Sequence, residues 1–238
     1  MAVAASFYYC FKKGRPYSDD KAASPTAAFD YILYLGCAFI GIEFGTIEAQ
    51  FHLLERFWDY YLLASACLFL FLAYRFDNRF VLSMAVINLG GWVGLRLEHL
   101  HIGLLSVKTR AILYAALLVA MGKWLERRRI KPHFTDTYLL FGLHLLFWTL
   151  LADVGPHGFA CLEFPLLAAL SAGVVYYAYG RRRFDYFLYA VVYGYIGLSA
   201  GVTHELHEFT LTALYFIASA TAVVVAVFRF RRSLEQSS

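Results

Sequence analysis

The sequence is poor in charged residues. Asp, Glu, Lys and Arg make up only 16% of its 238 residues, whereas ordinary soluble domains carry roughly 25%. Hydrophobic residues reach 61%, and water solvates so much apolar surface unfavourably. This composition excludes a soluble globular domain. We expect the excess of apolar side chains to face a lipid bilayer.

Proline is also scarce, and glycine is not enriched. The 5 prolines and 17 glycines exclude a collagen-like or low-complexity chain. The four cysteines lie far apart without a Cys-x-x-Cys pair, which excludes a small disulfide scaffold. The sequence contains no His-Glu-x-x-His, Gly-x-Ser-x-Gly or Walker motif, so no standard hydrolase or nucleotide-binding signature is available.

Long apolar runs bounded by charged residues are what the sequence does contain. A bilayer core about 30 Å thick requires roughly 20 residues of helix, and eight runs approach that length. We therefore predict an all-α, polytopic membrane helix bundle with short loops. The eight expected transmembrane helices cover residues 29–47, 57–74, 80–97, 109–125, 137–154, 159–179, 184–203 and 209–228.

The distribution of Lys and Arg predicts the orientation. Of these 21 residues, 17 fall on one side of the predicted spans and 4 on the other. Loops rich in Lys and Arg stay in the cytoplasm, so both termini are expected there, in an integral, multi-pass protein. The net charge of +4 then reflects topology rather than nucleic-acid binding. The expected partners are the lipid bilayer and other membrane subunits or a second copy.

The first residues are apolar but too few to span a bilayer. Lys12, Lys13 and Arg15 follow this stretch, which is the reverse of the order in a signal peptide. We expect an interfacial or loosely ordered cytoplasmic segment.

The sequence matches itself at an offset of 106 residues. Identities include Asp30 with Asp136 and His101 with His207. Because each half contains four spans, both would enter the membrane in the same direction, as parallel four-helix repeats. The predicted organisation is an N-terminal segment, two membrane repeats and a tail, over residues 1–28, 29–132, 133–233 and 234–238.

The third and seventh spans carry glycines at spacings that let helices approach closely. Gly90 and Gly94 lie in one span, and Gly197 and Gly201 lie in the other. Two arrangements remain open. The two spans pack against each other near the repeat axis, or each packs against its nearest neighbour.

Histidine and acidic residues gather at the predicted outer face, which the positive-inside rule does not require. The tightest cluster is Glu98 and His101 after the third span, with His204 and His207 after the seventh. Each pair is spaced i, i+3 and would share one helix face if the helices continue that far. Three imidazoles and a carboxylate can bind a divalent metal such as zinc, or they can relay protons. Capping of helix ends at headgroup level would produce the same pattern, so all three alternatives stay open.

Other polar residues of the outer half would support this cluster. His99 and Glu205 are expected to contact the metal ligands rather than the metal, and to orient them. Further relay positions are Glu43, Glu48, His52, Asp153 and His157. Asn88 and His144 fall near mid-membrane, where we expect each side chain to bond to a neighbouring backbone group, with a ligand role as the alternative.

Three segments carry a resemblance to a family. They are residues 28–36 (Ala-Phe-Asp-Tyr-Ile-Leu-Tyr-Leu-Gly), 73–80 (Ala-Tyr-Arg-Phe-Asp-Asn-Arg-Phe) and 92–96 (Trp-Val-Gly-Leu-Arg). Over residues 28–97 the chain resembles a family of predicted bacterial inner-membrane proteins of unknown function. The resemblance implies a bacterial cytoplasmic membrane. It implies no activity, and it transfers no functional residue.

Three functions are compatible with these observations. We expect first a non-catalytic membrane protein that binds or moves a small solute, a metal ion or a proton through the outer His and carboxylate cluster. The alternative is a structural or accessory subunit of a larger membrane complex, which the minimal loops favour. The third is an intramembrane metal-dependent hydrolase, against which the absence of a general-base motif argues.

Overall fold

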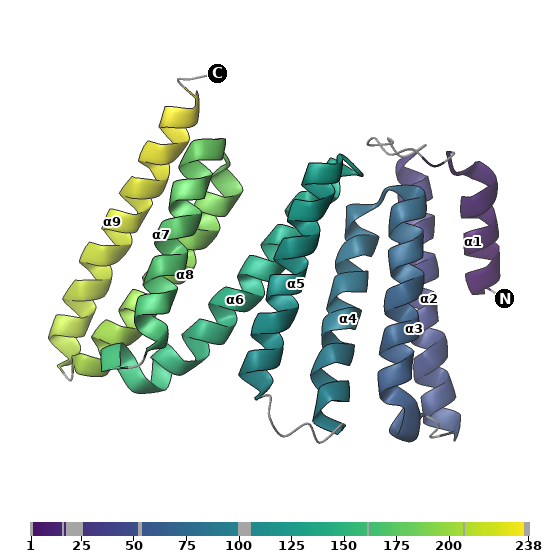
Figure 1. The fold of residues 1–238 in the computed structure, drawn as a ribbon, viewed down its shortest axis with the longest axis horizontal. Helices are drawn as coiled ribbons and strands as arrows, with labels where there is room; N and C mark the ends of the chain where they lie inside the picture. Colours follow the sequence, from purple (N-terminus) through teal and green to yellow (C-terminus); the bar gives the residue numbers. More distant parts are fainter. Residues whose placement is uncertain are drawn as a thin grey trace. The chain divides into compact units, whose positions relative to one another are not determined.

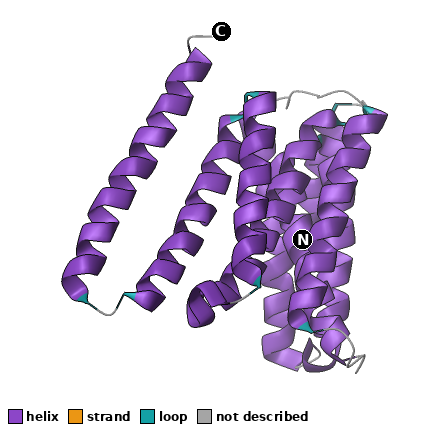
Figure 2. Ribbon diagram, turned by 60° about the vertical axis from the view of Figure 1, so that its left-hand side comes forward, coloured by secondary structure: helices purple, strands orange, loops and turns teal. Residues whose placement is uncertain are grey.

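The fold was determined as a computed structural model, which describes residues 2–15, 17, 26–51, 54–99, 106–160, 162–206 and 208–235. Side chains are described throughout these ranges except at 45, 48, 51, 54–59, 95–99, 155–157, 160, 234 and 235. Within the described residues every regular element is helical (Figure 2). The predicted all-α class is therefore confirmed.

Nine α-helices make up the described chain, with short 3-10 turns at Pro132–Phe134 (η1) and Gly158–Ala160 (η2). All eight predicted spans coincide with helices α2 to α9. The bounds are α1 Ala2–Lys13, α2 Ala27–Phe51, α3 Leu54–Phe76, α4 Arg79–His99, α5 Val107–Arg128, α6 Thr135–His157, α7 Glu163–Arg181, α8 Phe184–Glu205 and α9 Phe209–Glu235 (Figure 1).

Four helices in the described residues are long and apolar enough to cross a membrane. Shorter apolar stretches occupy Tyr60–Phe76 and Arg79–Gly94. The count of eight spans, the position of the termini and the repeat stay predictions. The four candidate spans are Ala27–Phe44, Pro132–Val154, Phe184–Glu205 and Phe209–Ser233.

The chain divides into two compact units within α6, Met1–Gly142 (unit 1) and Leu143–Ser238 (unit 2). In unit 1, α3 and α4 form a closely packed antiparallel pair. Asp77 ends α3 in the left-handed conformation, with φ 59°, and the Asn78 amide donates to the carbonyl of Ala73 at 3.1 Å. This backbone pattern satisfies the free carbonyls of a helix end. It lets the chain reverse within two residues.

Residues 2–13 form a packed helix where the sequence left a loosely ordered segment open. Cys10 of α1 is completely buried, and the ring of Phe11 meets that of Phe76 edge-on at 5.2 Å. A Cβ at Gly36 of α2 would lie 3.1 Å from the ring of Phe7. Helix α1 therefore packs on α2 and on the end of α3.

Unit 2 pairs α7 with α8 and places α9 against α8. A Cβ at Gly197 would collide with the terminal methyl group of Leu167 on α7, so a larger residue there would displace this side chain. Likewise, a Cβ at Gly90 of unit 1 would lie 3.0 Å from Tyr114 of α5, whereas nothing lies within 4 Å of one at Gly94. Among these contacts, the glycines of the third and seventh predicted spans meet neighbours within their own units.

Candidate functional site

The predicted outer cluster falls mainly outside the described residues. Helix α4 extends through Glu98 and His99, but their side chains are not described, and neither are residues His101 and His207. The side chains of Glu48, His52 and His157 also lie outside the described set. Convergence of the four predicted ligands therefore stays a prediction.

His204 and Glu205, at the end of α8, are described. Nδ1 of His204 lies 3.8 Å from Oε1 of Glu205, with side chains 45% and 62% exposed. The imidazole lies over Gly158, where a Cβ would come within 2.8 Å of Nδ1. Such an exposed ion pair contributes little to stability. The position of the His204 ring leaves no room for a side chain at residue 158, where the glycine has φ 59°.

The remaining predicted relay residues do not form a metal site with one another. Glu43 is exposed on α2, and Asp153 is half-buried on α6. Among the described side chains, no group of three or more His, Cys, Asp or Glu residues is arranged to hold a metal ion.

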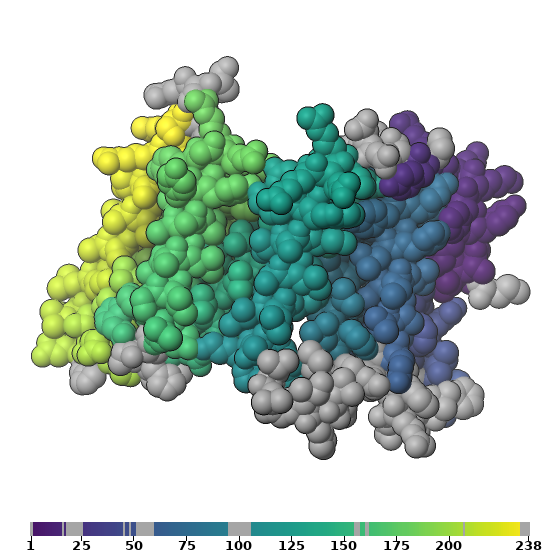
Figure 3. Space-filling view, viewed as in Figure 1, coloured from purple at the N-terminus to yellow at the C-terminus, as the bar shows by residue number. Residues whose placement is uncertain are grey.

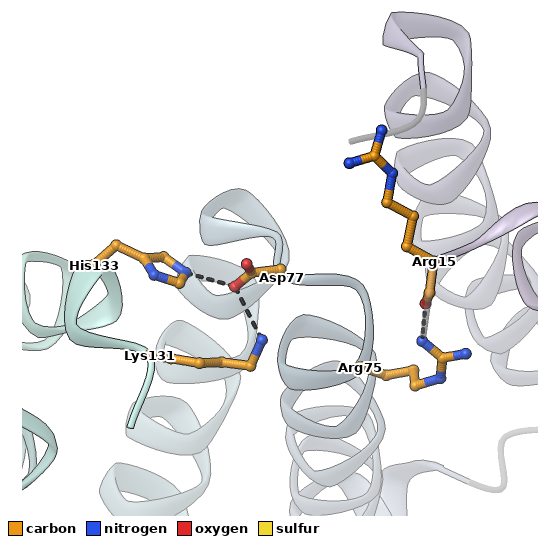
Figure 4. Close-up of polar contacts among 5 residues, drawn as sticks. All are labelled: Arg15, Arg75, Asp77, Lys131 and His133. Carbon is orange, nitrogen blue, oxygen red and sulfur yellow. Dashed lines mark hydrogen bonds and ion pairs between the residues drawn. The ribbon is translucent and has the colours of Figure 1, made fainter. Parts of the chain in front are cut away.

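A buried charged cluster at the opposite, Arg-rich helix ends was missed by the sequence predictions. Asp77, in the α3–α4 connection, accepts from two residues of the α5–α6 connection (Figure 4). Its Oδ1 lies 3.1 Å from Nζ of Lys131 and 2.5 Å from Nε2 of His133. The cluster therefore joins two connections that are far apart in the sequence.

Burial makes this cluster sensitive to change. The side chains of Asp77, Lys131 and His133 are 2%, 1% and 7% exposed. Burying an ion costs several kcal/mol, which close pairing must offset. Here the Lys131 ammonium also lies 4.9 Å from the ring centroid of Tyr17, within the range of a cation–π interaction. The cation thus has a carboxylate and an aromatic ring as neighbours.

Asn78 extends the polar network to α2. Its Oδ1 accepts from the amides of Phe80 and Val81 at 3.0 and 3.1 Å, which caps the first turn of α4. Its Nδ2 donates to Asp30 at 3.1 Å and to the Tyr34 hydroxyl at 3.0 Å. One side chain thus serves both as a helix cap and as a link between helices.

The chain that follows α1 is bonded to the same end of α3. Nη1 of Arg75 donates to the carbonyl of Arg15 at 2.6 Å (Figure 4). One feature of the sequence could have indicated this network. Asp77 is an acidic residue that stands between Arg75 and Arg79 in a short helix connection. The chemistry is that of a closed ion pair, so we assign it a role in holding the helix connections together.

A second polar network lies within unit 2, where α6 meets α8. Nε2 of His144 accepts from Nε1 of Trp148 at 3.1 Å, and Nδ1 lies 2.5 Å from the Tyr193 hydroxyl. The backbone partner predicted for His144 is therefore wrong, since two side chains bond to the ring. For Asn88 the prediction is confirmed, because Nδ2 donates to the carbonyl of Met84 at 2.8 Å.

The donor and acceptor roles in this network follow from chemistry. An indole N–H can only donate, so Nε2 of His144 must be the acceptor. The neutral ring then carries its proton on Nδ1 and donates to the oxygen of Tyr193. The hydroxyl proton of Tyr193 is not needed for either bond. The indole of Trp148 therefore donates to His144, and His144 donates to Tyr193, while Trp148 also interacts directly with the Tyr193 hydroxyl.

Comparison of the chain with protein-family models, curated proteins and solved structures found no match. The resemblance seen over residues 28–97 stays an expectation.

Proposed function

We propose that this chain is a multi-pass membrane protein that binds or moves a small solute or a proton at His144 and Tyr193. One observation carries the proposal. A neutral imidazole is hydrogen-bonded between an indole and a phenol, on two helices that are each long and apolar enough to span a membrane.

The depth of these residues supports the proposal. His144 lies nine residues after the first residue of α6, and Tyr193 lies nine residues after the first residue of α8. At 1.5 Å per residue, each is about 14 Å along its helix, close to the middle of a bilayer core about 30 Å thick. Ionisable residues at such depth are unfavourable, and they typically mark pathways for substrates or ions.

The network offers two chemical states. In the first, the hydroxyl proton of Tyr193 is available to an acceptor atom of a bound solute. In the second, a proton binds Nε2 of His144 and displaces the hydrogen bond from Trp148, because a charged imidazole can only donate. Uptake of a proton and rearrangement of the network are thereby coupled. The His144 side chain is exposed on α6, which leaves the ring accessible.

Proton flux in vesicles tests this function. Purified protein is reconstituted in vesicles that contain a pH-sensitive dye, and a proton gradient is imposed. We expect flux above that of empty vesicles, reduced about tenfold or more by His144→Ala and also reduced by Tyr193→Phe.

Thr149→Val is the matched control, because Thr149 lies on the same helix and bonds only to the carbonyl of Leu145. Equal flux in His144→Ala and Thr149→Val would contradict a role for His144. If the wild-type protein carries no protons, binding of hydrogen-bonding solutes is measured for the wild type and the same three variants.

The outer cluster remains a second, separate proposal. Glu98, His101, His204 and His207 would hold a divalent ion such as zinc, which has the preference for nitrogen and oxygen ligands that these residues supply. Metal content of the purified protein tests it. We expect about one ion per chain, lost in His204→Ala and retained in Glu43→Gln. A metal-free protein after purification with added zinc would refute the site.

An accessory subunit is the alternative, and α9 favours it. Its most apolar residues, within Phe209–Ser233, are not buried against the rest of the chain, and its side chains cover one side of unit 2 (Figure 3). Purification in mild detergent with its neighbours would show stoichiometric partners in this case. A lone chain with full proton or solute activity would exclude it.

A further inference from the structure

Unit 1 contains an apolar cavity of about 370 Å³. Helices α3, α4, α5 and the beginning of α6 line it. Val86, Leu118 and Tyr138 form inner walls that are each less than 5% exposed. An engineered apolar cavity of about 150 Å³ stays dry and binds benzene. A cavity of more than twice that volume has room for a larger hydrocarbon group.

The cavity opens sideways between the helices. Phe71, Leu117 and Met121 also line it and are 56%, 58% and 40% exposed. These three side chains lie along the lengths of α3 and α5, not at their ends. A molecule entering here would therefore come from the hydrocarbon region of a bilayer.

The tyrosines of the cavity present little polarity to an occupant. The hydroxyls of Tyr74 and Tyr138 lie 3.2 Å apart and bond to each other. The other lining residues are aliphatic or aromatic hydrocarbon side chains and one methionine. Such a lining selects a hydrocarbon chain and offers nothing to a charged or strongly hydrated solute.

Two exposed arginines mark the same end of the two helices that flank the cavity. Arg79 precedes Val86 by seven residues on α4, and Arg128 follows Met121 by seven residues on α5. Residues seven apart share a helix face, and at 1.5 Å per residue each arginine lies about 10 Å along its helix from that lining residue. Helices α4 and α5 are adjacent and antiparallel in Figure 1. Arg79, at the start of α4, and Arg128, at the end of α5, therefore lie at the same end of this antiparallel pair.

We propose that this cavity binds one hydrocarbon chain of an anionic phospholipid, whose phosphate is held by Arg79 and Arg128. Trp124 is 47% exposed on α5 between Met121 and Arg128, where an indole suits the boundary between chain and headgroup. Guanidinium groups bind phosphate oxygens through paired, charge-assisted hydrogen bonds. The site combines an apolar cavity, an interfacial ring and two cations in the order of a lipid molecule.

Native mass spectrometry of the detergent-solubilised full chain tests the headgroup. The protein is titrated with phosphatidylglycerol and with phosphatidylcholine of identical chains. We expect preferential retention of phosphatidylglycerol, weakened about tenfold in Arg128→Gln and in Arg79→Gln. Arg127→Gln is the control, since this exposed arginine is the neighbour of Arg128 but lies on another face of α5. Equal loss in Arg127→Gln and Arg128→Gln would overturn the assignment.

A second pair of variants tests the cavity. Leu117→Trp places a large ring at the mouth, whereas Leu113→Trp adds the same ring one turn away, at a site that is 55% exposed and does not line the cavity. We expect Leu117→Trp alone to weaken both lipids about tenfold, because chain burial is lost. Equal lipid binding by the two variants overturns the proposal. So does loss of a dimer without loss of lipid in Leu117→Trp, because the occupant is then a second copy.

Discussion

The connections α3–α4 in unit 1 and α7–α8 in unit 2 share one backbone design but differ in side-chain support. Asp77 and Arg182 are both left-handed, with φ 59° and 52°. The amide of the following residue bonds back to Ala73 at 3.1 Å in one case and to Ala178 at 3.0 Å in the other. A two-residue reversal between antiparallel helices is thus possible with an acidic or a basic sequence.

The two connections differ in what surrounds them. Asp77 is buried and bonded to Lys131 and His133, whereas Arg182 is exposed. Asn78 caps α4 with its side chain, but the N-cap residue of α8, Arg183, makes no side-chain cap bond. The α7–α8 turn therefore forms without a side-chain cap at the start of α8. In unit 1, the side chains of Asp77 and Asn78 also bond the α3–α4 turn to other helices and connections.

The largest difference between the connections should appear on removing the left-handed side chain. Asp77→Ala leaves the buried Lys131 without its carboxylate, which typically costs about 3 to 5 kcal/mol. Arg182→Ala changes an exposed residue and should stay within about 0.5 kcal/mol of wild type. Thermal unfolding in detergent, followed by circular dichroism, measures both. Similar midpoints for the two variants would show that the cluster adds no cohesion.

Removal of the capping side chain should give a smaller contrast. Asn78→Ala loses the cap of α4 and the bonds to Asp30 and Tyr34, so we expect a loss of about 2 kcal/mol. Arg183→Ala removes no cap bond, although it loses the cation–π contact with Tyr186 at 5.4 Å, and it should cost less than about 1 kcal/mol. The same unfolding experiment measures the pair. A loss in Arg183→Ala as large as in Asn78→Ala would remove the distinction.

Glycine at the left-handed positions should act in opposite directions. Arg182→Gly relieves the unfavourable left-handed conformation of a residue with a Cβ and should stabilise unit 2 by about 0.5 kcal/mol. Asp77→Gly gains the same relief but loses the ion pair, so it should be strongly destabilising. The sign of each shift in unfolding midpoint decides the matter. Two shifts of equal sign would contradict the comparison.

A pH-dependent effect is expected for α1, which packs beside the end of α3 in unit 1. Burial, together with the nearby Asp30 carboxylate, raises the pKa of the Cys10 thiol to about 11. An ordinary thiol has a pKa of about 8.5, so the folded protein keeps the proton after the unfolded chain has lost it. Stability should therefore fall as the pH rises from about 8.5 to 11. The unfolding midpoint measured across this range should show the decline, and Cys10→Ala should reduce it.

The sequence predicted the helices well because apolar runs between charges carry that information locally. All eight predicted spans coincide with helices. For residues 2–13 it left an interfacial and a loosely ordered segment open, since a short apolar run gives no sign of whether a neighbour covers it. Here the neighbours are Gly36 of α2 and Phe76 of α3. Such contacts depend on the fold and not on composition.

The polar sites show the same limit. Counting Lys131 among cytoplasmic charges treats it as solvated, although it is 1% exposed, because its partner Asp77 is distant in the sequence. For His144, depth along the helix was predictable, but the choice of Trp148 and Tyr193 over a backbone carbonyl depends on how α6 and α8 pack. Patterns locate such residues, and packing selects their partners.

The Asp77 cluster also affects the order in which contacts of unit 1 form while the chain is being synthesised. The reversal between α3 and α4 needs only residues within a few positions of one another, so it can close as soon as this pair has left the ribosome. His133 is 56 residues further along the chain. At about 5 to 20 residues per second, the Asp77 carboxylate waits roughly 3 to 11 seconds before both partners have been made. During that interval the nascent chain must leave this carboxylate in water or in contact with another protein, and closure of the cluster marks the end of assembly of unit 1.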